Sequence, residues 1–350
     1  MSVTTPVDSD TVLAMRQVSK RYGDVVAVDD LTLQIRDGEF FTIVGPSGSG
    51  KSTLIRILAG LEDPSSGTVH LRDSDITHVP ANERPTCMVF QSLALFRHRT
   101  VGQNIEFAQK MQGVPAEQRH KHALDIMKVV RLPEEFYARK INQCSGGEQQ
   151  RVALARALAS DPEILFFDEP LSAMDYRLRK TLEIEMKDLH DRTGKTFIYI
   201  THSLEEAMVM SDRIAIMREG RIVQTGTPQE IYNRPGSRFV AQFMGEVNIL
   251  SLTEGRIDEI DRQIGHPVEG NYLVLRPEYL RRLGEAGSAD ISFDARIDGV
   301  YMLGSRTQLH LSVGDKSLVA ELPASEAGEV APGQVSRWGF DIADASVTRD

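Results

Sequence analysis

Apolar residues in the first two thirds of the chain fall into short runs that alternate with longer helical patterns. Phe40–Val44, Ile164–Phe167 and Phe197–Ile200 are almost unbroken apolar runs, which predict strands buried on both faces. Leu31–Ile35 alternates apolar and polar side chains and predicts a half-buried strand. Helical patterns cover Leu54–Leu61, Thr100–Leu132 and Gly147–Ser160.

This alternation predicts a mostly parallel sheet covered on both faces, because parallel strands are joined by helical crossovers. Two further short runs, Arg213–Met217 and Arg221–Thr225, predict a hairpin that turns at Glu219 and Gly220. The first part of the chain is therefore expected to be an α/β domain.

After about Gly245 the helical patterns fade, and short β-like runs separated by Gly, Pro and Asp follow. Such spacing predicts a small all-β barrel or sandwich. We place the boundary near Phe243–Val247, which gives an α/β domain over residues 1–244 and a β-barrel domain over residues 245–350. The predicted strands of the second domain include Tyr272–Leu275, Ile291–Ile297, Gln308–Val313 and Ser317–Leu322.

Composition adds to this picture without changing it. The 350 residues are a length typical of two domains, and the hydrophobic fraction of 41% is ordinary for a globular protein. The net charge of −10 argues against nucleic acid as a partner, since binding to phosphate backbones usually needs a basic surface.

Cysteine spacing and hydropathy indicate the cellular compartment of the chain. Cys87 and Cys144 show neither a disulfide nor a zinc pattern, so we expect two reduced thiols in a cytosolic protein. Met1–Asp10 lacks the apolar segment of a signal peptide, and no run reaches the roughly 18 apolar residues of a spanning helix. A role at a membrane would therefore come through a partner.

The turn after Phe40–Val44 carries the strongest motif of the chain. It matches G-x-x-x-x-G-K-[ST], whose backbone N–H groups wrap a polyphosphate at the start of a helix. Lys51 is expected to reach the β- and γ-phosphates, and the Ser52 hydroxyl to hold Mg²⁺. The alternative is a flexible glycine- and serine-rich loop. The residues expected to bind nucleotide are Gly45, Pro46, Ser47, Gly48, Ser49, Gly50, Lys51, Ser52 and Thr53.

Two carboxylates follow the predicted strand Ile164–Phe167. Ligands of open α/β sheets lie beyond the carboxyl ends of the strands, where Asp168 and Glu169 stand. Asp168 is expected to hold Mg²⁺, and Glu169 to polarise the attacking water. The alternative is an ordinary strand exit with two solvated acids.

The segment Cys144-Ser145-Gly146-Gly147-Glu148 resembles the signature motif of the ABC ATPases, and it lies between the phosphate loop and the acid pair as in that family. The resemblance implies a RecA-like P-loop domain with a helical subdomain at about residues 92–160. It also implies hydrolysis of ATP with Mg²⁺.

The resemblance extends to four further positions. Tyr22 is similar to the aromatic residue that stacks on adenine, and Gln91 to the Q-loop glutamine, which contacts Mg²⁺ and the γ-phosphate. Asp175, in Ser172-Ala173-Met174-Asp175, matches the D-loop, and His202 the switch histidine. The resemblance implies catalysis by Glu169, His202, Lys51 and Gln91, with Ser52, Gln91 and Asp168 at the metal.

A capped helix explains how the signature acts. Ser145 and Glu148 have the spacing of a capping box, and the helix that follows offers its N-terminal amides to an anion. The resemblance implies that this anion is the γ-phosphate bound by a second copy of the chain. Ser145, Gly146, Gly147, Glu148 and Asp175 are therefore included among the nucleotide-binding residues.

This sequence departs from the family pattern at two signature positions. Cys144 replaces the usual leucine, which changes packing but no hydrogen bond, and Glu148 replaces the usual glutamine. Glu148 adds negative charge beside the partner's nucleotide. We expect an active site that closes more slowly.

The residues that follow Gln91 are expected to face a membrane partner. Leu93, Leu95 and Phe96 would give the apolar contact with a permease helix, unless they pack internally.

The C-terminal part is similar to the TOBE domain of importer ATPases, through Leu275-Arg276-Pro277-Glu278 and Tyr301-Met302-Leu303-Gly304. It is expected to be an OB-like barrel that regulates or dimerises. Ala94-Leu95-Phe96 and residues 226–232 most resemble the spermidine/putrescine import subunits. Ferric-iron, phosphonate, sulfate and sugar importers are the alternatives.

The resemblance implies a homodimer at the cytoplasmic face of the inner membrane, bound to permease subunits and served indirectly by a periplasmic or extracellular solute-binding protein. No nucleic-acid partner is expected. A soluble ABC ATPase of DNA maintenance or translation is a distant alternative, as is a catalytically degenerate regulatory subunit.

Overall fold

The computed structural model describes residues 10–172, 174–265, 269–284, 287–328 and 330–350. These residues form two compact units that divide between Pro228 and Gln229. The residues before Asp10, on which the expectation about a signal peptide depends, lie outside this description, and so does Ala173 of the predicted D-loop.

The main sheet of the first unit has six strands in the order β10-β9-β3-β8-β7-β6. The pairs from β9 to β6 are parallel, and β10 is antiparallel to β9. The predicted mostly parallel sheet and the predicted hairpin are thus confirmed. The strands are β3 (Phe40–Val44), β6 (Thr86–Val89), β7 (Ile164–Asp168), β8 (Thr196–Ile200), β9 (Arg213–Arg218) and β10 (Arg221–Gly226).

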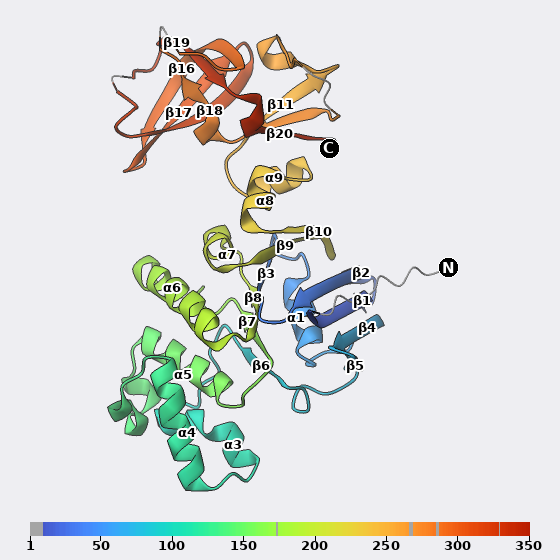
Figure 1. The fold of residues 1–350 in the computed structure, drawn as a ribbon, viewed down its shortest axis with the longest axis vertical. Coiled ribbons are helices and arrows are strands. Elements are labelled where there is room, and N and C mark those ends of the chain that lie inside the picture. The colour runs from blue at the N-terminus through green and yellow to red at the C-terminus, as the bar shows by residue number, and fades with distance from the viewer. Residues whose placement is uncertain (1–9, 173, 266–268, 285–286, 329) are drawn as a thin grey trace. The chain divides into compact units, whose positions relative to one another are not determined.

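Alternation along the central strands supplies two separate cores. Phe40 of β3 belongs to one apolar cluster with Leu154 and Leu182, whereas the next residue, Phe41, joins Leu54 and Val69 in another. Successive side chains of a strand point to opposite faces, so an unbroken apolar run requires cover on both sides. Figure 1 shows α6 on one side of these strands and α1 with β1, β2 and β4 on the other.

A second sheet of this unit was not predicted. It is antiparallel, in the order β2-β1-β4-β5, and its apolar residues share a core with α1. Only the segment Leu31–Ile35 was expected as a strand, and it lies inside the longer β2. The strands are β1 (Thr11–Tyr22), β2 (Val25–Arg36), β4 (Ser66–Leu71) and β5 (Ser74–Asp75).

The helices largely follow the predicted segments. The helix after the phosphate loop begins at Lys51, because Gly50 at its start is left-handed (φ 101°), and it ends at Leu58 before Gly60 (φ 73°). The region 100–132 is divided among three helices. The helices of the first unit are α1 (Lys51–Leu58), α2 (Val101–Ile105), α3 (Phe107–Met111), α4 (Ala116–Val129), α5 (Gly146–Leu158), α6 (Tyr176–Thr193) and α7 (Leu204–Met210).

The second unit is an all-β domain with a few short helices, as predicted. Its two five-stranded sheets, in the orders β13-β12-β11-β14-β20 and β15-β19-β16-β17-β18, enclose Trp338 and Phe340, both 0% exposed. The strands are β11 (Asn248–Thr253), β12 (Arg256–Ile257), β13 (Arg262–Gln263), β14 (Tyr272–Leu275), β15 (Arg281–Arg282), β16 (Ile291–Met302), β17 (Arg306–Val313), β18 (Lys316–Pro323), β19 (Val335–Phe340) and β20 (Ala345–Thr348).

Two short helices, α8 (Pro228–Asn233) and α9 (Arg238–Phe243), belong with the second unit, although the sequence grouped them with the first. The reason is Arg276, a buried residue that follows β14. Its guanidinium donates to the carbonyl oxygens of Tyr232, at 3.1 Å, and Ala241, at 2.9 Å. These bonds join both helices to the barrel.

Candidate functional site

The register of the main sheet brings the predicted site residues to one edge. Ile200 of β8 is paired with Ile43 of β3 on one side and with Asp168 of β7 on the other. All three strands are parallel, so the phosphate loop, the acid pair and His202 follow at the same ends of neighbouring strands. This is the edge at which open α/β sheets bind ligands.

Glycine is required at both ends of the phosphate loop. A Cβ on Gly45 would stand 2.1 Å from the carbonyl oxygen of Met217, and one on Gly50 would stand 2.1 Å from that of Ala27. Only a glycine allows the backbone to pass so close to these two strands. Backbone carbonyls of β9 in the main sheet and of β2 in the second sheet thus restrict the shape of the loop.

Lys51 is buried under the loop that it follows. Its ammonium donates to the carbonyl oxygens of Gly45, at 2.8 Å, and Pro46, at 3.0 Å. Burial lowers the pKa of Lys51, while the carboxylates of Glu169 and Asp168 oppose that change. A desolvated cation held among carbonyl dipoles is well suited to receive phosphate oxygens.

The pKa of Asp168 is raised by burial first and by the neighbouring Glu169 second. A group whose folded pKa is raised stabilises the fold only when protonated, so its ionised form costs stability at neutral pH. The destabilisation by ionised Asp168 is absent below the pKa that an aspartate has in the unfolded chain, about 3.9. It grows as the pH rises from there through the higher pKa that Asp168 has in the folded chain.

We therefore expect Asp168→Asn to raise the Tm of the nucleotide-free chain at pH 7 and the gain to shrink toward about pH 4. Asp161→Asn provides the opposite sign, because Lys195, at 2.8 Å, lowers the pKa of Asp161. Thermal unfolding in the presence of a chelator measures both. A loss of stability for Asp168→Asn at pH 7 would contradict the expected sign.

The side chains of Glu169 and His202 are in contact. The Nδ1 atom of His202 lies 3.1 Å from Oε2 of Glu169, and the histidine side chain is 61% exposed. Glu169 adopts a left-handed backbone (φ 45°), and its N–H donates to the carbonyl of Ile200 at 3.0 Å. A strained residue held by a neighbouring strand is common at active sites, where the strain directs a side chain.

Gln91 contacts Ser172, the first residue of the D-loop match, and the sequence did not predict this contact. Its amide donates to the hydroxyl of Ser172 at 2.9 Å, and that hydroxyl donates to the Glu169 carbonyl at 3.0 Å. The backbone that follows is left-handed at Leu93 and Ala94, and the Arg156 side chain donates to both of their carbonyls. The Q-loop is therefore linked to the acid pair and to α5.

The apolar residues expected to face a permease pack at least in part against other side chains of this chain. Leu93 and Leu95 pack against the core of the helical part, and Phe96 packs against Phe107 with ring centroids 4.6 Å apart and the ring planes tilted by 52°. The structure thus favours the internal alternative for these side chains.

Tyr22 lies at the end of β1 and is 46% exposed. Its hydroxyl donates to Glu62, and Lys20 lies 5.1 Å from its ring centroid and 3.1 Å from the Glu62 carboxylate. The exposed ring is held at its hydroxyl by Glu62 and contacted by Lys20, which leaves ring surface exposed for stacking on a base.

The predicted capping box of the signature is confirmed. The Ser145 side chain accepts from the Glu148 N–H at 3.3 Å, and the Ser145 N–H donates to the Glu148 carboxylate at 2.7 Å. In the described part of the chain, the side-chain contacts of this pair go to one another and to Arg139, and none goes to the phosphate loop. The exposed start of α5 is therefore not bonded to its own nucleotide loop and is free to serve another anion.

The charge of Glu148 is partly offset by Arg139, whose guanidinium lies 3.8 Å away. Glu148→Gln keeps the capping oxygen and removes the charge, so we expect ATP hydrolysis to rise about twofold, the size of an exposed charge effect. The gain should fade at high salt. Steady-state ATPase rates at low and high salt, with Glu134→Gln as the control, measure this; an unchanged rate would show that the departure is neutral.

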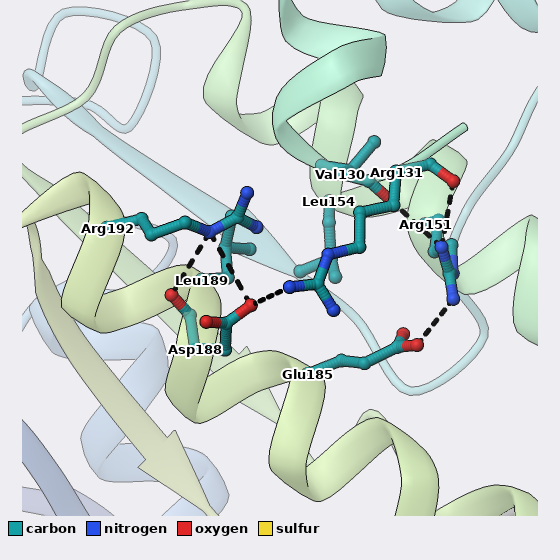
Figure 2. A pocket seen from close by; sticks show the side chains of 8 residues that line it. All are labelled: Val130, Arg131, Arg151, Leu154, Glu185, Asp188, Leu189 and Arg192. Carbon is teal, nitrogen blue, oxygen red and sulfur yellow. Dashed lines mark hydrogen bonds and ion pairs between the residues drawn. The ribbon is translucent and has the colours of Figure 1, made fainter. Parts of the chain in front are cut away.

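Ion pairs tie the signature helix, and the segment that follows α4, to α6 (Figure 2). Arg151 of α5 pairs with Glu185 at 2.5 Å, and Arg131 pairs with Asp188 at 2.5 Å, both acids being on α6. At the start of α6 the carboxylate of Asp175 caps the helix by accepting from the Leu178 N–H at 3.0 Å. The signature and the D-loop are thus at the ends of two joined helices.

Sequence reasoning included Ser172 only as a member of the D-loop match, without a contact of its own, and predicted no role for Glu206 of α7. Ser203 and Glu206 have the same capping spacing that revealed the signature helix, so a signal for α7 was present. No local pattern indicated the contact between Ser172 and Gln91, because it depends on the tertiary fold.

A phosphate loop after β3, an acid pair at the same end of the parallel strand β7 and a separate capped helix with a glycine pair together define an ATP-binding cassette. Two family models match the chain: ABC transporter over residues 28–172 and TOBE domain over residues 273–347.

Named relatives agree with this class. The chain is 47% identical to the spermidine/putrescine import ATP-binding protein of Pasteurella multocida over 75% of this chain and 71% of that one. It is 42% identical to the protein of that name in Mesorhizobium japonicum, over 92% and 89% of the two chains. A relative of the same name in Rubrobacter xylanophilus is 41% identical over 93% and 91%.

Solved structures resemble the first unit. A dimeric ATP-binding cassette in a post-hydrolysis state, bound to ADP and Pi, is 32% identical with a TM-score of 0.54, over 62% of this chain and 98% of that one. A nucleotide-free cassette of an ABC transporter is 26% identical with a TM-score of 0.59, over 67% and 100%.

The chain belongs to the ABC transporter family, as an ATP-hydrolysing import subunit with a C-terminal TOBE domain. Among the described residues, no helix is long and apolar enough to cross a bilayer. Cys87 and Cys144 are both free thiols, as predicted.

Proposed function

We propose that this chain powers the import of polyamines, with hydrolysis carried out by Glu169 and His202 at the edge of the main sheet. The observation that carries the catalytic part is the 3.1 Å contact between these two side chains beside the phosphate loop. The solute is inferred from the spermidine/putrescine import relatives, which resemble this chain across both of its units.

Each polar group has a distinct task in hydrolysis. The Glu169 carboxylate orients and polarises the attacking water, and His202 contacts the γ-phosphate while Glu169 holds its ring. Lys51 neutralises charge that develops on the β- and γ-phosphates. Gln91, which is linked through Ser172 to Glu169, reports whether the γ-phosphate is present.

The oxygen donors at the site fit Mg²⁺, which prefers carboxylate, hydroxyl and phosphate oxygens. Ser52 and Asp168 would hold it, together with Gln91 and the nucleotide, and it would offset charge on the phosphates. The raised pKa of Asp168 means that the site favours an added positive charge. Oxygens of the nucleotide phosphates and of water would supply the remaining ligands.

Two copies of the chain form the complete site. The start of α5, with Ser145 and Gly146 exposed, offers N–H groups to the γ-phosphate held by the other copy. Binding of ATP draws the copies together, and hydrolysis releases them. Permease subunits at the cytoplasmic face of the membrane convert this closure into transport.

Uptake tests the proposal. Cells that lack this chain receive the wild type or Glu169→Gln, and uptake of labelled putrescine and spermidine is measured. Polyamine uptake that is restored by the wild type and absent with the variant is expected. Restoration of ferric-iron, phosphonate, sulfate or sugar uptake instead would move the chain to another importer and leave the ATPase assignment intact.

A further inference from the structure

The turn that carries His202 is tied on both sides to one buried carboxylate. Glu206 of α7 is only 3% exposed, and its Oε2 accepts from the Thr201 hydroxyl at 2.7 Å. The Thr201 oxygen accepts from the Ser203 N–H at 2.9 Å, and the Ser203 hydroxyl accepts from the Glu206 N–H at 3.3 Å. The residues before and after His202 are therefore joined to Glu206, while the imidazole stays exposed.

The same carboxylate oxygen has a second donor. The hydroxyl of Tyr199, a fully buried residue of β8, donates to Oε2 of Glu206 at 2.8 Å. Burial, and then the charge of Glu206, raises the pKa of Tyr199 well above its usual value, so the phenol remains a donor. The Tyr199 ring is packed against Phe40 and Phe167, with centroids 6.0 Å apart in both cases.

Burial of the Glu206 carboxylate costs free energy, and a role in the site would explain why the fold contains it. Burying a charge costs several kcal/mol unless hydrogen bonds compensate for it, and no cation is paired with Glu206 among the described residues. Hydrogen bonds to an ionised group are shorter and more directional than neutral ones. They suit a turn that must hold one geometry.

We propose that Glu206 is a positioning residue for hydrolysis, which acts through Thr201 to hold the turn so that His202 stays within reach of Glu169 and the γ-phosphate. This inference rests on the proposed role of His202. Glu206 touches neither nucleotide nor water in the proposed chemistry; it fixes the backbone on which the histidine stands.

Two variants that each remove one hydroxyl distinguish an effect on the position of His202 from a general loss of stability. Thr201→Val removes the hydroxyl that joins the turn to Glu206, and Tyr199→Phe removes the other bond to the same oxygen without touching the turn. We expect Thr201→Val to lower kcat by about 10-fold, since small misplacements of a catalytic group have such effects. The KM for ATP should stay within about twofold, because the phosphate loop is unchanged. Thr201→Ser should restore the wild-type kcat.

Tyr199→Phe should also lower the Tm, because it removes one buried hydrogen bond, with kcat within about twofold of the wild type. Equal losses of kcat in these two variants would overturn the proposal, as would a wild-type kcat in Thr201→Val. Glu206→Met is similar in size and has no oxygen to accept from Thr201; it replaces Thr201→Val if that variant is insoluble, with the same expected fall.

The His202→Ala variant separates the proposed catalytic role of His202 from the proposed positioning role of Glu206. If His202→Ala hydrolyses ATP normally, the proposed catalytic role of the histidine fails. If His202→Ala is inactive and Thr201→Val is normal, only the positioning role of Glu206 fails.

Discussion

Replacing Glu169 with glutamine is expected to lower ATP hydrolysis by about 100-fold or more, the usual contribution of a general base. The amide has the shape of the carboxylate but cannot polarise the attacking water. ATP binding should persist, because the contacts of Lys51 and the loop do not involve Glu169 directly and the loss of its charge also lowers the pKa of Asp168. Phosphate release and nucleotide titration measure the two quantities separately.

Glu163→Gln is the matched control, since Glu163 lies at the opposite end of the same strand and pairs with Arg72 at 2.9 Å. Its ATPase rate should equal that of the wild type. Normal hydrolysis in Glu169→Gln, or an equal loss in both variants, would refute the role given to Glu169.

The second large effect is expected from Gly50→Ala, which should both unfold the phosphate loop and abolish nucleotide binding. A left-handed alanine costs about 1–2 kcal/mol. The new Cβ also meets the Ala27 carbonyl at 2.1 Å, and overpacking of this kind costs about 1–3 kcal/mol more. Thermal unfolding of the nucleotide-free chain reports the stability, and nucleotide titration reports the binding.

Gly48→Ala provides the control. Gly48 is also left-handed (φ 79°), but a Cβ there has nothing within 4 Å. It should therefore show the backbone cost alone and lose clearly less Tm than Gly50→Ala. Equal losses would mean that contact with the Ala27 strand does not shape the loop.

The main sheet was predictable because its strands are buried on both faces. Phe40–Val44 was predicted with the bounds that the structure has, since an unbroken apolar run has few other solutions. The phosphate loop and the acid pair follow directly from such strands, so their meeting at one edge was predictable too.

Other parts depended on tertiary contacts. α6 is rich in charge, and only Leu182, Met186 and Leu189 of its apolar stripe are buried, so its pattern is weak despite the Asp175 cap and Gly194 at its end. The place of α8 and α9 is set by the guanidinium of Arg276, which is distant in sequence. No local pattern contains such a contact.

Among the contacts of the site residues, too, those within one segment were predictable and those between distant segments were not. Spacing revealed the capping box of Ser145 and Glu148, because both residues belong to one helix start. It did not reveal the bond between Gln91 and Ser172, whose partners lie in different loops. Sequence motifs locate single residues well and cross-loop partners poorly.

Mixing two inactive variants tests most directly whether hydrolysis takes place at a site shared by two copies of the chain. Lys51→Ala disables the phosphate loop, and Ser145→Arg disables the signature; each variant alone should be inactive. An equimolar mixture should regain about a quarter of the wild-type ATPase activity, because half of its dimers are mixed and each mixed dimer has one intact shared site. If the mixture stays inactive although the copies exchange partners, neither copy uses the other's signature, and the shared site does not exist.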